Sequence, residues 1–304
     1  MIVRPRPGAL AILFAWRGSI LPQIAPQVTA ITAVACLVVA TEQGWAHAIP
    51  LTAGIGPFTL IGLALSIFLS FRNNACYDRW WEARKVWGSL VVEARGLARL
   101  LGALLPEDDA RRRRCLERLA GFAHALHARL RGQDDAAAAA PHLPQAERGR
   151  LASRASPADA ALSGLAADLA GAMREGTLSD VSFGLLEQKL AGLSGVQAAC
   201  ERIQGTPLPF AYTLLLYRTA WLYCLLLPFG LAASLGWGTP VATALVAYTF
   251  FGLDALGDEL EEPFGSAAND LPLDALLRGI DGIVQDALGA PVPPPLSPER
   301  YWLR

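Results

Sequence analysis

Residues 55–71 read IGPFTLIGLALSIFLSF and contain no charged side chain. A helix needs about 20 apolar residues to cross the hydrocarbon core of a bilayer, which is about 30 Å thick. Working outward along the chain, three more windows of this kind lie at residues 24–40, 219–235 and 241–256. The sequence therefore predicts an all-α membrane protein with four transmembrane helices per subunit and a helical domain between the second and third.

The composition agrees with a membrane protein and argues against several other classes. Of the 304 residues, 53% are hydrophobic and only 17% are charged, whereas soluble domains carry about 25% charged residues. The formal net charge of −1 gives no case for nucleic acid as a partner. The five cysteines form no CxxC pair and no Cys/His cluster, so neither a disulfide framework nor a zinc site is expected.

Motifs of catalytic chemistry are missing from the sequence as well. There is no GxxxxGK(S/T), GxSxG or HExxH, the motifs that serve phosphate binding, acyl transfer and metal-assisted hydrolysis. His124 and His127 are spaced to share one helix face, which suits a metal contact, but no third ligand lies near them in the sequence. We therefore expect neither an enzyme nor a bound cofactor.

Lys and Arg are distributed unequally around the predicted spans. The nine basic residues close to the spans all lie on the side of the two termini and the long middle segment: Arg4, Arg6, Arg17, Arg72, Arg79, Arg84, Lys85, Arg202 and Arg218. The linkers on the other side, around His47 and at residues 236–240, contain none. Cytoplasmic loops are enriched in these residues. We expect a multi-pass protein of the inner (plasma) membrane with both termini in the cytoplasm.

The pattern divides the chain into five segments. They are a cytosolic N-terminal segment (1–22), the first two transmembrane helices (23–78), a cytosolic helical domain (79–205), the last two transmembrane helices (206–258), and a C-terminal helical segment with an extended tail (259–304). Within the domain, residues 134–159 combine an alanine run with prolines and polar residues, which predicts a flexible loop or a frayed helix. Thr206-Pro207 has the cap and first-turn residues of a helix start.

The second span carries a polar stripe. On a helical wheel, Thr59, Ser66, Ser70 and Asn74 fall within an arc of about 80°. Three bulky apolar residues, Leu63, Ile67 and Phe71, overlap this arc. Polar residues inside a span face protein or water, and such a face suits a pore with a hydrophobic constriction. Ser and Thr also mediate packing between helices, so the wheel alone leaves pore lining and helix packing open.

Two carboxylates continue the same face beyond the membrane. Asp78 and Glu82 follow the span at helical spacing. A ring of acidic residues below a pore raises the local concentration of cations. The alternative is that each residue forms a local ion pair with Arg79 or Lys85.

Longer motifs resemble one family. The runs are FRNNACYDRWWEARKVWG at 71–88, ELEEPFGSAANDLPL at 259–273, VQAACERI with TPLPFAYTLLLYR at 196–218, and RGSILPQI at 17–24. They are similar to sequences of bestrophins, particularly bacterial members. The resemblance spans nearly the whole chain and implies a homopentamer around a central pore lined by the second helix.

The resemblance also implies two constrictions. The apolar neck of the family falls on Leu63, Ile67 and Phe71, the residues beside the polar stripe. A second, cytosolic aperture falls within residues 181–184, with Phe183 as the candidate.

A calcium clasp is expected to be largely absent. In animal bestrophins, acidic residues follow the PFG tract and hold calcium, whereas here only Asp270 remains in the corresponding run. Ca²⁺ takes about six to eight oxygen ligands. Glu259, Glu262 and Asp270 are therefore only weak candidates for a metal site.

The expected function is a channel for monovalent ions. Bacterial relatives are associated with monovalent cations and animal members with anions. Because Asp78 and Glu82 stand where animal members tend to carry uncharged residues, we expect a preference for Na⁺ or K⁺. An anion (chloride) channel of the same fold is the alternative, as is a non-conducting, membrane-anchored protein whose helical domain binds a partner. The expected partners are further copies of the chain, the bilayer and the permeant ions.

Overall fold

The computed structural model describes residues 1–4, 8, 12, 15, 18–45 and 56–304. The described residues form helices and contain no strand beyond short bridges such as that between Ile2 and Trp302. The linker around His47, the start of the second predicted span at Ile55, and Arg6 and Arg17 lie outside the described residues.

The chain divides into two compact units. The first, which we call the membrane unit, comprises residues 5–80 and 207–262. The second, which we call the helical domain, comprises residues 1–4, 81–206 and 263–304. Helix α3 (Gly56–Leu104) is unbroken and contributes its first part to the membrane unit and its second part to the helical domain.

The membrane unit consists of four apolar helices. They are α2 (Leu21–Trp45), the first part of α3, α9 (Phe210–Leu235) and α10 (Thr239–Glu261). Three segments are long and apolar enough to cross a membrane, namely Leu21–Glu42, Phe58–Leu104 and Phe210–Glu261. The last segment contains both α9 and α10, which are joined by the short 3₁₀ helix η2 (Gly236–Gly238). The all-α membrane architecture predicted from the sequence is therefore confirmed.

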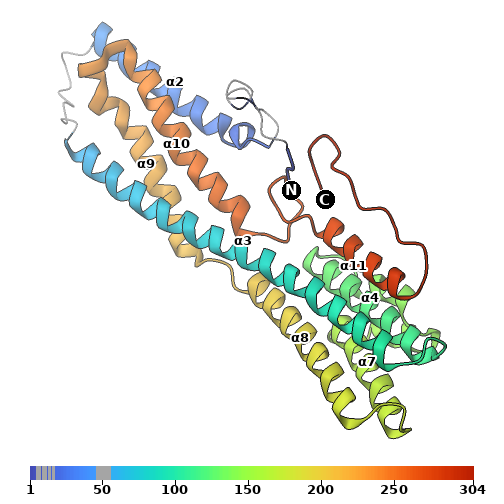
Figure 1. The fold of residues 1–304 in the computed structure, drawn as a ribbon. Coiled ribbons are helices and arrows are strands. Elements are labelled where there is room, and N and C mark those ends of the chain that lie inside the picture. The colour runs from blue at the N-terminus through green and yellow to red at the C-terminus, as the bar shows by residue number, and fades with distance from the viewer. Residues whose placement is uncertain (5–7, 9–11, 13–14, 16–17, 46–55) are drawn as a thin grey trace. The chain divides into compact units, whose positions relative to one another are not determined.

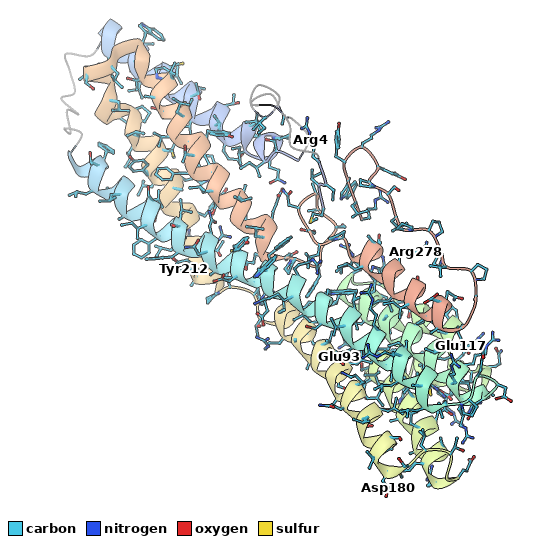
Figure 2. The ribbon with its side chains drawn as sticks, viewed as in Figure 1. Arg4, Glu93, Glu117, Asp180, Tyr212 and Arg278 are labelled. Atoms are coloured by element: carbon cyan, nitrogen blue, oxygen red, sulfur yellow. The ribbon has the colours of Figure 1, made fainter. Side chains whose placement is uncertain are left out.

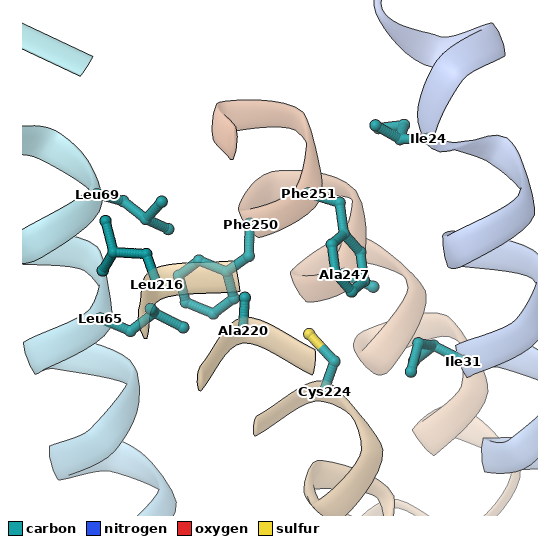
Figure 3. Packing of buried hydrophobic residues seen from close by; sticks show 10 residues of the cluster. All are labelled: Ile24, Ile31, Leu65, Leu69, Leu216, Ala220, Cys224, Ala247, Phe250 and Phe251. Atoms are coloured by element: carbon teal, nitrogen blue, oxygen red, sulfur yellow. The ribbon is translucent and has the colours of Figure 1, made fainter. Parts of the chain in front are cut away.

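A single apolar cluster holds these four helices together (Figure 3). Each helix contributes side chains to it: Ile24 and Ile31 from α2, Leu65 and Leu69 from α3, Leu216, Ala220 and Cys224 from α9, and Ala247, Phe250 and Phe251 from α10. Small residues among them let the backbones approach closely, which is how helices gain packing energy where lipid competes for apolar contact.

Two glycines show how close the approach of α3 and α9 is. A Cβ added at Gly62 would lie 2.6 Å from the Tyr223 hydroxyl oxygen, and one added at Gly230 would lie 2.6 Å from a ring carbon of Phe58. Real Cβ atoms do not tolerate such distances. The two helices thus each bring a glycine against an aromatic ring of the other.

The helical domain is built around α4 (Ala110–Leu130). This helix contacts α7 (Pro157–Arg174), α8 (Asp180–Gly205) and α11 (Leu273–Ala287). Figure 1 shows α7 and α11 beside it. Side-chain caps mark the starts of α4, α7 and α8. Asp109 accepts the backbone N–H of Arg111 at the start of α4, and Ser156 precedes Pro157 at the start of α7. Such caps satisfy N–H groups that have no partner within the helix.

The segment 134–159, predicted to be a flexible loop or a frayed helix, is mostly helical. It contains α5 (Asp135–Ala139), the 3₁₀ helix η1 (Ala140–His142) and α6 (Gln145–Leu151). Asp134 caps α5, and buried side chains such as Leu143 anchor the segment. Glu147 on α6 accepts two hydrogen bonds, of 2.6 and 2.7 Å, from the buried Arg118 on α4. Of the two alternatives, the flexible loop was wrong, because the partners that order these helices are distant in sequence.

Thr206-Pro207 does not start a helix. Thr206 ends α8, with its N–H bonded to the Arg202 carbonyl at 3.1 Å, and α9 begins only at Phe210, after Pro209. A residue before proline is disfavoured in the helical conformation. Two of the residues 206–209 are prolines, Pro207 and Pro209. The next helix, α9, therefore begins only after the second proline.

Two histidines join α4 to α11. His124 Nε2 lies 2.8 Å from an Asp281 carboxylate oxygen, and His127 Nε2 lies 2.7 Å from one of Asp274. The two rings have separate carboxylate partners, so the pair predicted as a weak metal contact is used to dock a helix. His142 stacks on His124 with ring centroids 4.4 Å apart.

We predict that the helical domain loses stability in mild acid. Burial lowers the pKa of His127 and of His142 from the ordinary value of 6.5. The unfolded chain then binds more protons than the folded chain, so the stabilisation is complete above about pH 6.5 and falls as the pH drops below it. The Tm should fall between pH 7.5 and 5, by about 2–4 °C for each kcal/mol lost.

The variant His127→Asn/His142→Asn provides the control for this effect. It should show a flatter dependence of Tm on pH than the wild type over the same interval. Equal slopes for the two proteins would show that these histidines do not cause the acid sensitivity.

Candidate pore-lining face of α3

One side of α3 faces the bundle and the other is exposed in the single chain. Leu65, Leu69, Arg72 and Cys76 are spaced by three or four residues and are buried. This spacing repeats once per helical turn, so it defines one face. The opposite side of the helix is largely exposed among the described residues.

All seven residues predicted to line a pore lie on the exposed side of α3. The three apolar residues Leu63, Ile67 and Phe71 are 60%, 46% and 60% exposed. The polar residues Thr59, Ser66, Ser70 and Asn74 are exposed as well. The exposed side is nevertheless wider than the predicted stripe, because it also includes Ile61 and Phe68. The assignment of a neck therefore stays a prediction.

Ser66 makes a local hydrogen bond. Its hydroxyl donates to the carbonyl oxygen of Gly62, one turn earlier, at 2.8 Å. Hydroxyls in membrane helices satisfy their protons in this way when no neighbouring helix offers an acceptor.

The two predicted selectivity residues differ in their surroundings. Glu82 forms an ion pair of 2.6 Å with Arg202 on α8, rather than with Arg79 or Lys85. Asp78 is exposed, and no described residue forms an ion pair with it. The negative charge of Glu82 is thus partly offset by Arg202, whereas no described residue forms an ion pair that offsets the charge of Asp78.

Arg72 sits in a buried ion cluster that the sequence analysis missed. Its guanidinium is fully buried and lies 2.8 Å from a carboxylate oxygen of Asp254 on α10. It also pairs with Asp258, and a Glu261 oxygen lies 3.4 Å away. An unpaired charge is expensive to bury, and three carboxylates around one guanidinium offset that cost.

Arg72 is one of the basic residues from which the inner side of the membrane was predicted, and that prediction is not tested by its burial. The structure adds that Arg72 points into the bundle. The signal that could have revealed the cluster is Asp254, which lies inside the fourth apolar window with Asp258 one turn later. An ionisable residue within a span calls for a named partner.

Comparison with known proteins decides the family. Residues 1–286 match the sequence family described as bacterial/fungal bestrophin protein. The chain belongs to this bestrophin family.

Similar proteins support the assignment along the whole chain. A protein of Mesorhizobium japonicum named a voltage-dependent anion channel-forming protein is 47% identical over 302 residues, covering 99% of this chain and 97% of its own. A protein of Escherichia coli K12 with the same description is 40% identical, covering 99% of both chains. The crystal structure of a bacterial bestrophin homologue from Klebsiella pneumoniae matches with a TM-score of 0.84 and 36% identity, covering 88% of this chain and 99% of that one.

The predicted cytosolic aperture of the bestrophin lies at the start of α8. Phe183 is in the first turn of the helix, and its side chain is half-buried. Val181, at the edge of the same predicted stretch, is 76% exposed. On exposure alone, Val181 is the better placed of the two to meet other molecules.

The three weak candidates for a metal site differ in their surroundings. Asp270 is buried, and its carboxylate accepts the N–H of Ala267 at 2.6 Å, which closes the turn after Gly265. Glu259 accepts a hydrogen bond of 2.8 Å from Gln23, and Glu262 is exposed. In the described part of the chain, no three His, Cys, Asp or Glu residues are grouped to hold a metal.

We predict that Arg72→Leu destabilises the protein by about 3–5 kcal/mol, because it leaves Asp254 buried without a counter-charge. Thermal unfolding in detergent micelles measures the loss. The double variant Arg72→Leu/Asp254→Leu should recover part of it. Lys85→Leu, which removes an exposed charge from the same helix, should cost less than about 0.5 kcal/mol. Equal losses from Arg72→Leu and Lys85→Leu would contradict a structural role for the cluster.

Proposed function

We propose that this chain is one subunit of an oligomeric ion channel whose pore is lined by the exposed face of α3. Its membership of the bestrophin family supports a channel rather than an enzyme. The observation that carries the proposal is the exposed run of Leu63, Ile67 and Phe71, beside four polar residues, on a helix apolar enough to cross a membrane.

A pore of this kind requires several copies of the chain. Each subunit supplies one helix with a free face, and one helix cannot enclose a channel. A ring with rotational symmetry repeats the same face around an axis and closes the pore. We infer a homopentamer from the family resemblance, set in the inner membrane with both termini in the cytoplasm, as the distribution of Lys and Arg favours.

The three apolar residues would form the narrow part of the pore. A ring of Leu, Ile or Phe side chains repels water, and a constriction that dewets stops ions without a physical plug. The long helix would continue below the neck and bring Asp78 and Glu82 to the ion path.

We predict that Leu63→Ala/Ile67→Ala/Phe71→Ala raises ion conduction. Smaller side chains widen the constriction and lower the barrier to wetting. Single-channel recordings in planar bilayers should show larger current steps or more frequent opening than in the wild type. The matched control is Ile61→Ala/Phe68→Ala, which removes exposed apolar side chains of α3 that lie away from the predicted pore face. If this control increases the current as much as the triple variant, or if a folded wild-type oligomer carries no current, the proposed neck is wrong.

Asp78 is the better candidate for selectivity. Its carboxylate has no described ion-pair partner, whereas that of Glu82 is paired with Arg202. Symmetric copies of Asp78 would place several negative charges around one axis and favour monovalent cations. The names of the relatives from M. japonicum and E. coli favour anions instead, so anion conduction is the second candidate function.

We predict that Asp78→Asn shifts the reversal potential toward that of the anion by more than Glu82→Gln does. The measurement is the reversal potential under a KCl gradient, with low ionic strength on one side because salt screens such charges. A wild-type reversal potential near that of chloride would establish the anion channel. Equal shifts for the two variants would rule out a special role for Asp78.

A further inference from the structure

A large cavity in the helical domain is lined by four arginines. Its volume is about 780 Å³, and its walls come from α3, α4, α11 and the tail that follows α11. The basic residues are Arg95 and Arg99 from α3, Arg112 from α4 and Arg278 from α11. Figure 2 labels Arg278. One carboxylate, Asp286, is also in the lining.

These arginines lack the partners that other arginines of the domain have. Arg111, Arg114, Arg118 and Arg129 all form ion pairs with carboxylates. Within the part of the chain that the structure describes, no carboxylate forms an ion pair with any of the four in the cavity. Arg112 donates only to the carbonyl oxygen of Ala287, at 3.3 Å.

The tail gives the cavity its apolar wall. Gly289, in the left-handed region with φ of 67°, ends α11 and lets the chain reverse direction. Val292 then lies close to Gly282, where an added Cβ would be 3.5 Å from the valine methyl group. A Cβ at Gly279 would meet nothing within 4 Å, so this face of the helix is open. The lining thus combines apolar side chains with guanidinium groups.

Like charges that lie close together repel one another. A cluster of arginines without carboxylate partners therefore suggests that the site binds an anion. A concave surface lined by one sign of charge concentrates ions of the opposite sign. The planar guanidinium group donates paired hydrogen bonds that match the oxygens of phosphate. The volume lies within the range of about 300–1,000 Å³ that is typical of sites for small molecules.

We propose that this cavity binds a small anion that carries two or more phosphate groups. Four guanidinium groups against one carboxylate leave an excess of positive charge that a single phosphate would not balance. The apolar wall formed by the tail accepts the carbon skeleton of such a molecule. The phosphates come either from a soluble compound or from a lipid headgroup, and the chemistry of recognition is the same.

Calorimetric titration of the purified full-length chain in detergent tests this site. The probe is inorganic triphosphate at low ionic strength. The variant Arg99→Gln/Arg278→Gln should weaken binding about tenfold or more, since it removes two charge-assisted contacts. The control Arg113→Gln/Arg174→Gln removes the same charge from exposed positions outside the cavity. Its effect should stay within about twofold because these exposed side chains do not contact the bound anion and water of high dielectric constant separates them from it.

A lipid source is distinguished by reconstitution. If triphosphate does not bind in detergent, but vesicles containing cardiolipin, a lipid with two phosphate groups, bind the wild type and not Arg99→Gln/Arg278→Gln, the phosphates are supplied by lipid. Failure of both probes, or equal weakening in the control variant, would overturn the site. A change in oligomer mass in Arg99→Gln/Arg278→Gln would also overturn it, because the cavity would then be filled by a second copy of the chain.

The variant Asp286→Asn distinguishes a loss of the binding site from a loss of folding, because it is expected to increase the affinity. Removing the lone carboxylate should tighten triphosphate binding by about threefold, a gain of about 0.7 kcal/mol. A misfolded protein cannot bind more tightly. Unchanged or weaker binding in a variant that keeps the wild-type Tm would count against the proposal.

Discussion

The arrangement of the membrane unit depends on one buried cation. The Arg72 guanidinium is enclosed by Asp254, Asp258 and Glu261 of α10, and it cannot leave them without exposing a charge to an apolar medium. This contact sets the rotation of α3 about its own axis. Once Arg72 points into the bundle, Leu65 and Leu69 follow on the same face. Leu63, Ile67 and Phe71 are then left outside. The exposed face is thus a consequence of the ion cluster as much as of its own residues.

Apolar windows were sufficient to predict the four membrane helices, because the thickness of the bilayer sets the length and hydropathy that a spanning helix needs. Both are properties of the local sequence. Contacts between distant segments were not predictable in the same way. Residues 134–159 looked like a loop because alanine, proline and polar residues mix there. Their helices depend on Asp134 as a cap and on Arg118, which binds Glu147 from another helix. Thr206 had the residues of a helix start, yet the second proline at position 209 decided the outcome.

For the candidate site as well, the local sequence was enough to place residues on a helix face, whereas contacts with distant segments could not be predicted. The helical period placed seven residues on one side of α3, and all seven are exposed there. The period could not show that Glu82 has a partner, because Arg202 is 120 positions away in the sequence. Nor could it show that Arg72 is buried, since its partners lie on α10. Asp254 was the local signal, because a carboxylate within an apolar segment requires a partner in the protein that neutralises its charge.

The hydrogen bond of Ser66 has a consequence for any ion that passes this face. Because its proton is committed to the Gly62 carbonyl, the hydroxyl has only lone pairs left to offer on its outer side. Repeated around an axis, such oxygens would form an electronegative collar that carries no net charge. A collar of this kind replaces part of the hydration shell of a cation and offers nothing to an anion. It would favour one sign of ion without placing a carboxylate inside the membrane.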